Sequence, residues 1–486
     1  MTQINTNTAS MLAQRVLRMQ NKALTVSLER LSTGLRINRG KDDPAGLIAS
    51  ENLRAEKKAI ASAISNAERA EQVVNVAEGG LQEIQNLVVE LQSLVAASAN
   101  EAGLSAEEKD ANQLQIDSIL QTIDRLANDT SFQGTKLLNG TFDYTVEGIS
   151  QTLLTDVSIN SARIPDGGTL EVDITVLTSG RTASVFLSTG GNFDSGAGEG
   201  SITVEVTGND GVQQFTFASG TSQANIINAV NSFSTAIGVS ASNAGGGLVE
   251  FRSTGFGSNE FVRVKELNGL SNDFILASAG ASVSNDVKET GRDAIVTING
   301  QQATANGLEA RVATGGFDVV VLLSGGSALN MTGGNTNFTI TGGGANFNLS
   351  PNVNLAGKVS LGIETVTTGN LGKAGTGFLA SLSAGGTNNV VNGDLSTAQK
   401  IIDEAIRQVS TLRGRLGAFQ KNTVGATINS LGISLENTAA AEASIRDTDF
   451  AKETAELTRA QILGQAATQA LAIANAMPTS ILALLG

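Results

Sequence analysis

Cysteine, histidine and tryptophan are absent from this 486-residue sequence, which has only one tyrosine and four prolines. Without thiols or imidazoles, the chain lacks the side chains that most often act as nucleophiles, general bases and zinc ligands. It also cannot form a disulfide bond, which is typical of a chain that folds without oxidation. We therefore expect no enzyme: serine–lysine or carboxylate-pair chemistry would remain, and no pattern in the sequence arranges either.

The charge balance disfavours a second group of functions. The chain has 32 basic and 46 acidic residues, a net charge of −14, and contact with nucleic-acid phosphates needs a basic face. Residues 1–60 are the exception, with ten Lys and Arg against five Asp and Glu. This stretch could seek a membrane surface, but a helix that faces a partner protein is the preferred interpretation.

No targeting or membrane-spanning segment is visible. The first ten residues, MTQINTNTAS, lack a basic stretch followed by an apolar one and do not read as a signal peptide. No apolar run reaches the roughly 18 residues that a transmembrane helix needs. The residues alone therefore indicate a cytosolic protein, unless export uses another route.

The composition changes twice along the chain. Residues 1–140 are rich in Ala, Leu, Gln, Glu and Asn with helical spacing, and residues 396–486 return to this composition. Between them, residues 141–395 are rich in Gly, Ser, Thr, Val and Asn with strand-like alternation. We expect a multidomain protein with an α-helical coiled-coil core, formed by paired N- and C-terminal segments, and a central mainly-β (α+β) outer insertion.

Heptad spacing predicts the N-terminal helices of this core. One helix is expected over residues 57–99, although Gly79 and Gly80 interrupt its apolar series. A second is expected from Ser105 to Asn128, because Ser105 and Glu108 form a capping box. The apolar series of the first helix consists of Ile60, Ala63, Ala67, Ala70, Val74, Ala77, Leu81, Ile84, Val88, Leu91 and Val95.

The C-terminal zone carries two further series, one over residues 398–419 and one that begins at Ala460. The helix containing the second should kink or restart near Met477, because Pro478 follows. Apolar helices at both ends of a chain imply burial against other chains. The predicted polymerisation seam comprises Leu24, Leu28, Leu31, Leu35, Leu463, Ala467, Ala470, Ala474, Met477, Ile481 and Leu484.

The middle of the chain has strand-like alternation, for example over residues 201–207 and 294–300, with one helix expected from Ser222 to Phe233. Asp42 and Asp43 could bind calcium, but the spaced ligands of a calcium loop are missing. A capped helix start after Pro44 is the preferred interpretation. No cofactor and no metal site are predicted.

Four motifs resemble the signatures of bacterial flagellins. RLSTGLRINRGKDDPAGL from Arg30 and TSFQGTKLLNG from Thr130 are similar to the N-terminal signature. ASIRDTDFAKET from Ala443 and RAQILGQA from Arg459 are similar to the C-terminal one. The resemblance covers roughly residues 1–145 and 396–486 and is loose in between, where the sequence is similar to β modules found in flagellins and hook-associated proteins.

This resemblance implies a structural subunit that polymerises into the flagellar filament for swimming motility, with both termini folding and pairing as coiled coils after export. It implies secretion through the flagellar type III apparatus to an extracellular filament. The implied partners are copies of the chain itself, hook-associated and cap proteins, and a flagellin export chaperone, with no nucleic acid and no membrane. The implied domains are 1–45 and 446–486 (inner core), 46–165 and 391–445 (helical core, with a β-hairpin region), and 166–390 (outer).

The resemblance also concerns a host receptor. Many flagellins are detected by a Toll-like receptor through a stretch of the long inner helix that commonly has an Arg, a second Arg two residues later, and then Glu-Leu. The matching positions here are Glu90, Gln92, Ser93 and Leu94. An Arg donates hydrogen bonds, whereas an ionised Glu only accepts them. Recognition of this chain by the receptor is therefore expected to be weak.

Other functions stay open on the sequence. A hook–filament junction protein shares the terminal signatures, but the full C-terminal signature and the large insertion favour a filament subunit. The insertion could instead be an adhesin or glycan-binding module, which the low aromatic content, 4% of residues, weakly disfavours. An enzymatic insertion is disfavoured by the absence of His and Cys.

Overall fold

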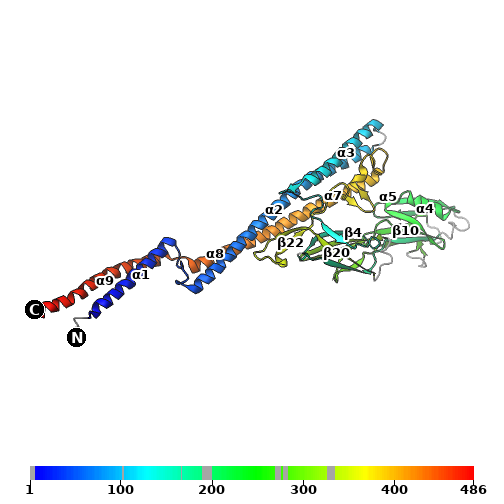
Figure 1. Cartoon of the computed structure of the whole chain (residues 1–486). Coiled ribbons are helices and arrows are strands. Elements are labelled where there is room, and N and C mark those ends of the chain that lie inside the picture. Colours follow the sequence, from blue (N-terminus) through cyan, green and yellow to red (C-terminus); the bar gives the residue numbers. More distant parts are fainter. Residues whose placement is uncertain are drawn as a thin grey trace. The chain divides into compact units, whose positions relative to one another are not determined.

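The computed structural model describes residues 6–100, 103–165, 167–188, 200–268, 275–276, 283–325 and 334–485, with the backbone alone at 275–276, 283, 334 and 478–485. The chain divides into two compact units. The first comprises Met1–Glu71, Asn348–Gly357 and Gln420–Gly486, and the second comprises Gln72–Phe347 and Lys358–Phe419. Figure 1 labels their elements.

The first unit is helical. It contains α1 (Thr8–Thr33), the N-terminal part of α2 (Pro44–Ser98), η1 (Leu355–Gly357), α8 (Ala426–Arg446) and α9 (Phe450–Leu485). Local capping fixes the helix ends: Asn7 accepts a hydrogen bond from the Ser10 amide, and Gly34 ends α1 with φ +73°. The expected helix start at Pro44 is confirmed, because the Asp43 carboxylate accepts from the Gly46 amide at 2.9 Å.

A kink or restart is expected near Met477, and the restart is wrong, because α9 continues through Pro478 as one helix. The kink stays a prediction. A proline removes a single backbone donor. The flanking residues are mostly Ala, Leu and Ile, and the strong helix propensity of Ala and Leu offsets that loss.

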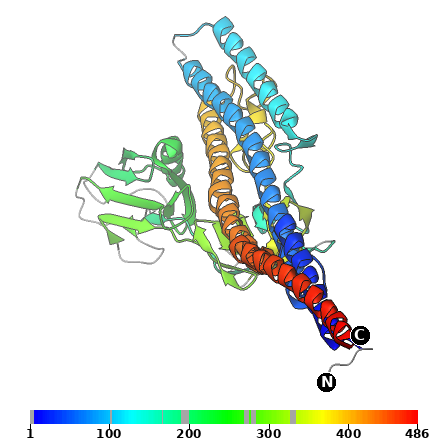
Figure 2. The same cartoon turned by 90° about the vertical axis from the view of Figure 1, so that its left-hand side faces the viewer.

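The second unit joins a three-helix bundle to a β region. The bundle consists of the C-terminal part of α2, α3 (Ala106–Asp129) and α7 (Leu395–Ala418), which lie side by side in blue, cyan and orange in Figure 2. The predicted capping box of Ser105 and Glu108 is confirmed. After α7 the chain makes a π-helical segment, η3 (Phe419–Gly425), before α8.

The predicted apolar series are buried. All eleven members of the series from Ile60 to Val95 are at most 3% exposed. In the series that begins at Ala398, most members up to Leu416 are buried to the same degree. Gly79 and Gly80 do not break α2. A Cβ atom added at Gly80 would lie 2.6 Å from Thr130 Oγ1, so Gly80 permits close packing of the segment after α3.

Side chains of the bundle hold an irregular segment between residues 363 and 392. Gln113 accepts from the Val390 amide and donates to the Leu382 carbonyl, both at 2.9 Å. The Asp124 carboxylate accepts from the amide and hydroxyl of Thr368, both at 2.8 Å. These bonds add to the backbone hydrogen bonds of turns and loops in the segment, whose regular elements are β23 (Gly372–Lys373), β24 (Gly377–Phe378) and η2 (Leu379–Leu382).

Two antiparallel β modules make up most of the remaining chain, and the second is inserted into the first. The host module has sheets of order β16-β15-β5-β20-β3 and β17-β18-β19-β4 over one apolar core. Its strands are β3 (Tyr144–Glu147), β4 (Leu154–Ala162), β5 (Leu170–Thr178), β15 (Ile295–Ile298), β16 (Gln301–Gln302), β17 (Thr304–Asn306), β18 (Glu309–Thr314), β19 (Phe317–Leu323) and β20 (Gly334–Gly343).

The inserted module has sheets of order β13-β12-β6-β10-β9 and β14-β11-β7-β8 around a separate core, into which α4 places Ile226 and Val230. The strand expected near residues 294–300 is confirmed as β15 of the host module. The strand expected near residues 201–207 and the helix expected after Ser222 are confirmed in the inserted module. Its elements are β6 (Ser184–Ser188), β7 (Ser201–Thr207), β8 (Val212–Ala218), α4 (Gln223–Asn231), α5 (Ser234–Ile237), β9 (Val239–Gly245), β10 (Leu248–Ser253), β11 (Phe261–Glu266), β12 (Ile275–Leu276), β13 (Val283–Ser284) and β14 (Asp286–Thr290). Short hairpins complete the set: β1 (Ser131–Phe132) with β2 (Thr135–Lys136), and β21 (Ala345–Asn348) with β22 (Lys358–Leu361).

One carboxylate ties the two β modules together. Asp293 lies between them in sequence and accepts from the amide and hydroxyl of Ser258 in the inserted module, at 2.9 and 2.5 Å. It also accepts from the Gly307 amide of the host module at 2.7 Å. The Ser258 hydroxyl is the main reason that the pKa of Asp293 lies below its ordinary value, and the two amides lower it further.

We predict that Asp293→Ala loosens this junction by about 2 kcal/mol, because hydrogen bonds to an ionised acceptor are lost. Hydrogen exchange should then become roughly 30-fold faster at Ser258 and Gly307. The pKa of Asp293 is lower in the folded chain, so its contribution is complete above the unfolded value of about 3.9 and is lost as the pH falls through the folded value. Asp293→Asn, which keeps one acceptor oxygen, should lose less protection, and equal exchange in all three proteins would contradict the prediction.

Candidate assembly interface

The terminal helices α1 and α9 pack along each other, as Figure 1 shows. The least exposed positions of α1 recur at steps of three and four, which is the spacing of a coiled-coil seam. This internal seam on α1 consists of Ser10, Ala13, Leu17, Gln20, Leu24, Ser27 and Leu31, all buried or half-buried. Polar and small residues occupy four of these positions, and half-buried leucines occupy the other three.

The facing positions on α9 follow the same spacing. Ala460, Ala467 and Ala474 are 5–7% exposed. They alternate with half-buried residues, so that the internal seam on α9 consists of Glu453, Leu457, Ala460, Gly464, Ala467, Leu471 and Ala474. Of the positions predicted from the sequence, Leu24, Leu31, Ala467 and Ala474 therefore lie between α1 and α9 of the same chain.

Other predicted seam positions face solvent. Leu463, Ala470 and Met477 recur every seven residues on α9 and are exposed, Leu463 by 44% and Met477 by 58%. We call these three the outer stripe. Leu28 on α1 is also exposed, by 48%, and Leu35 is half-buried in the loop after α1. Ile481 and Leu484 lie outside the residues whose side chains are described.

Further large apolar side chains lie near the outer stripe or on α1. Ile462 and Ile473 on α9 are 61% and 64% exposed. On α1, Met11, Leu12 and Met19 are each more than half exposed. An apolar surface of this extent is unusual in a monomeric soluble protein and indicates a protein–protein contact.

Polar bonds fix both ends of the helix pair. Near the start of α1, Asn7 donates to the Ala474 carbonyl and Ser10 donates to Asn475 Oδ1, both at 2.7 Å. Beyond the C-terminal end of α1, the Arg36 amide donates to the Arg446 carbonyl at 2.7 Å and the Thr448 amide to the Gly34 carbonyl at 2.9 Å. The turn between α8 and α9 is thereby joined to the loop after α1.

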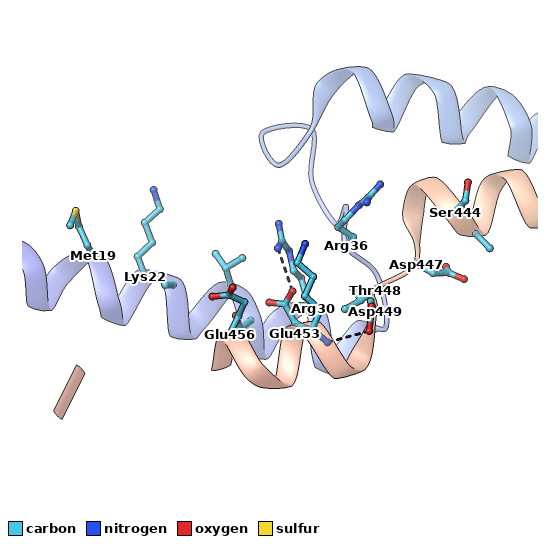
Figure 3. Close-up of a pocket in the computed structure, with 15 residues that line it drawn as sticks. Met19, Lys22, Arg30, Arg36, Ser444, Asp447, Thr448, Asp449, Glu453 and Glu456 are labelled. Atoms are coloured by element: carbon cyan, nitrogen blue, oxygen red, sulfur yellow. Dashed lines mark hydrogen bonds and ion pairs between the residues drawn. The ribbon is translucent and has the colours of Figure 1, made fainter. Parts of the chain in front are cut away.

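A cleft of about 820 Å³ lies beside this turn. Its lining includes four cationic side chains, Lys22, Arg30, Arg36 and Lys452, and four anionic ones, Asp447, Asp449, Glu453 and Glu456. Figure 3 shows Arg30 facing Glu453, with 3.5 Å between Nη1 and Oε2. The balanced charges suit a polar protein surface better than an anionic or cationic small ligand. Sequence reasoning missed the cleft because segments more than 400 residues apart form it.

The four receptor-related positions lie on α2, and one of them, Gln92, contacts α7. Glu90 and Ser93 are exposed, and Leu94 is half-buried. Gln92 is half-buried, and its side-chain amide donates to Asp403 Oδ1 on α7 at 2.8 Å. Only Glu90 and Ser93 therefore have side chains that are largely available to a partner.

Within the described part of the chain, no helix is both long enough and apolar enough to span a bilayer. The same residues contain no group of three or more acidic side chains placed to hold a metal ion.

We predict that Ala467→Asp unfolds the α1–α9 pair in the free chain, whereas Ala470→Asp leaves it intact. Asp has the same low helix propensity at both positions, but at residue 467 its carboxylate would be buried without a partner, at a cost of several kcal/mol. Circular dichroism should show lost helix for the first variant alone. Equal helix content in both variants would contradict the assigned internal seam.

Comparison with known proteins accounts for both ends of the chain. Residues 4–143 match the bacterial flagellin N-terminal helical region, and residues 399–485 match the bacterial flagellin C-terminal helical region. A flagellin of Salmonella rubislaw is 30% identical, and flagellin C of Vibrio cholerae is 28% identical, each over 99% of this chain and 99% of the relative. A solved structure of FliC from Burkholderia pseudomallei covers 72% of this chain and 99% of its own, at 15% identity and a TM-score of 0.27.

The terminal matches and the full-length relatives agree with the helical core and the apolar surface of its terminal helices. The chain belongs to the bacterial flagellin family and is a structural subunit of the flagellar filament.

Proposed function

We propose that the subunits polymerise by burying the outer stripe of α9 against terminal helices of neighbouring subunits. The exposure of Leu463, Ala470 and Met477 carries this proposal, because α1 of the same chain covers a different face of α9. The exposed Met11, Leu12 and Met19 offer apolar surface of the same kind on α1. Contacts between unlike surfaces that do not close into a ring generate an open helical polymer.

In this proposal the residues of the predicted polymerisation seam divide into contacts within a subunit and contacts between subunits. Ala467 and Ala474 hold α9 to α1 within a subunit, and the outer stripe joins subunits. Leu28 and Leu35, together with Ile481 and Leu484, remain predicted contacts between subunits. In the proposed domain organisation, residues 1–45 and 446–486 form the inner core, 46–165 and 391–445 the surrounding helical core, and 166–390 the outer surface.

Secretion, partners and the absence of catalysis complete the proposal. The subunit is exported and assembled outside the cell, and an export chaperone covers its C-terminal apolar helix beforehand. Hook-associated and cap proteins contact the two ends of the polymer. The chain is not an enzyme, which its lack of His and Cys supports. No observation favours a hook–filament junction protein, since the full-length relatives named above are flagellins.

We predict that Ala470→Asp yields a folded subunit that does not polymerise. Burying an unpaired carboxylate between subunits costs about 3 kcal/mol or more, which would raise the critical concentration by over 100-fold. Sedimentation of purified subunits added to short filament seeds would measure it. Gln469→Asp, at the neighbouring exposed position, is the matched control and should polymerise normally. Normal assembly of Ala470→Asp would exclude the outer stripe as an interface.

We further propose that a host Toll-like receptor recognises this subunit weakly through α2. Glu90 presents a carboxylate where other flagellins commonly have an arginine, and reversing a charge within an interface costs several kcal/mol. Gln92, at the second arginine position, is engaged with Asp403.

We predict that the double variant Glu90→Arg, Gln92→Arg is a stronger agonist than the unmodified subunit, by tenfold or more in half-maximal dose, because an arginine supplies donors that a glutamate lacks. Receptor-expressing reporter cells treated with monomers would show the difference. The matched control Glu83→Arg changes an exposed glutamate two turns earlier on α2 and should leave the response unchanged. Strong signalling by the unmodified subunit at the dose that saturates an ordinary agonist flagellin would refute the idea.

A further inference from the structure

Methionine is distributed unusually in the described part of the chain. The sequence has five methionines, of which Met1 and Met331 lie outside the described residues. The other three all lie on the terminal helices and are more than half exposed: Met11 by 62%, Met19 by 56% and Met477 by 58%. Methionine is usually a core residue, yet the cores of both β modules and of the helical bundle contain none among the described residues.

These methionines lie on the surface proposed for assembly. Met477 is a member of the outer stripe, one heptad beyond Ala470. Met19 is one heptad beyond the exposed Leu12, and Figure 3 shows it at the edge of the cleft. Met11 precedes Leu12 on the same helix. A thioether packs well at such contacts because it is unbranched and polarizable.

We propose that Met11, Met19 and Met477 form an oxidation-sensitive site, and that converting them to sulfoxides prevents the free subunit from polymerising. The proposal rests on the polymerisation mechanism given above, and its partner is a second copy of the chain. The oxidant is a peroxide: its oxygen atom is transferred to the thioether sulfur, which loses two electrons, while hydrogen peroxide is reduced to water.

The physical reason is a change in polarity, together with the added oxygen atom on a sulfur that becomes pyramidal. A sulfoxide carries a strongly polar S–O bond, so the side chain keeps nearly its length but gains an acceptor that must be desolvated on assembly. The internal seam contains no methionine, so oxidation leaves unchanged the residues that hold α1 to α9. Oxidation therefore acts on contacts between subunits.

Assembly should protect the three methionines from oxidation. A thioether exposed in the free subunit is open to peroxide, whereas one buried between subunits is shielded from it. Existing filaments should thus resist oxidation that inactivates subunits before assembly, and reduction of the sulfoxides should restore polymerisation.

The test compares free subunits and preformed filaments of the full chain, each treated with hydrogen peroxide and mapped by peptide mass spectrometry. We expect oxidation at all three methionines in free subunits and at least about tenfold slower oxidation in filaments, as for groups that react only after local opening. Oxidised subunits should show a critical concentration raised about tenfold or more, since each buried acceptor would lack a partner.

The triple variant Met11→Leu, Met19→Leu, Met477→Leu provides the matched control. It keeps Met1 and Met331, so peroxide still modifies the chain, but its polymerisation should be unaffected by the treatment. Met477→Gln, whose amide is polar without oxidation, should assemble poorly even when untreated. Circular dichroism of the oxidised subunit should show unchanged helix content.

Three results would overturn the proposal: normal assembly of fully oxidised subunits, equal oxidation rates in subunits and filaments, or peroxide sensitivity of the triple leucine variant. The first and third results leave polymerisation through the outer stripe intact, whereas equal oxidation rates would also contradict the burial of Met477 within that stripe. That mechanism fails separately if unoxidised Ala470→Asp assembles normally.

Discussion

The packing of α1 against α9 is the constraint on which the function of this chain depends, because it decides which faces of the terminal helices remain available. Alanine, glycine and serine at the internal seam let the helices approach closely, and the leucines and isoleucines of α9 are thereby directed partly outward. The helical bundle differs in where its apolar residues lie. Along α2, the eleven positions of the apolar series from Ile60 to Val95 are buried within the subunit, although Ile48, Val76 and Val89 on its other faces are exposed. Apolar side chains thus stabilise the subunit on α2 and are left for contacts between subunits on α9.

The helical core could be predicted from the sequence where the apolar residues fit only one heptad register. On α2 the spacing from Ile60 to Val95 admits a single register, and every member is buried. On α9 two registers share Ala460, Ala467 and Ala474: one continues through Leu463 and Ala470, the other through Gly464 and Leu471. Leucine at 463 makes the first register look more apolar. The structure places the second register against α1, and periodicity does not report which partner a helix meets.

Composition gave less information on the remaining parts. Alternating residues predicted strands in the middle of the chain, but the insertion of one β module into another depends on pairings between distant segments, such as β5 with β15. The segment from residue 363 to 392 has little regular structure, and the side chains of Gln113 and Asp124 on α3 supply some of the hydrogen bonds that hold it. A glutamine on a helix gives no sign in the sequence that it pairs with a chain segment nearly 280 residues away.

The composition of the internal seam also affects how stable the terminal helices are before assembly. Burial of apolar surface contributes roughly 25 cal/mol per Å². The internal seam has five leucines, all only half-buried, among small or polar residues, so it removes limited apolar surface from water. Helices in proteins owe most of their stability to packing, because nucleation is unfavourable and ordering each residue costs about 1–2 kcal/mol of entropy. Large side chains such as Leu463, Ile473 and Met477 are exposed in the single chain, so most of the apolar burial open to α9 comes only with neighbouring subunits. We infer that the helix pair is weakly stable by itself, and that assembly supplies the larger share of the free energy that holds it folded. Folding of the termini and growth of the filament are then one coupled equilibrium, in which the internal seam selects the pairing and the outer surface provides the driving force.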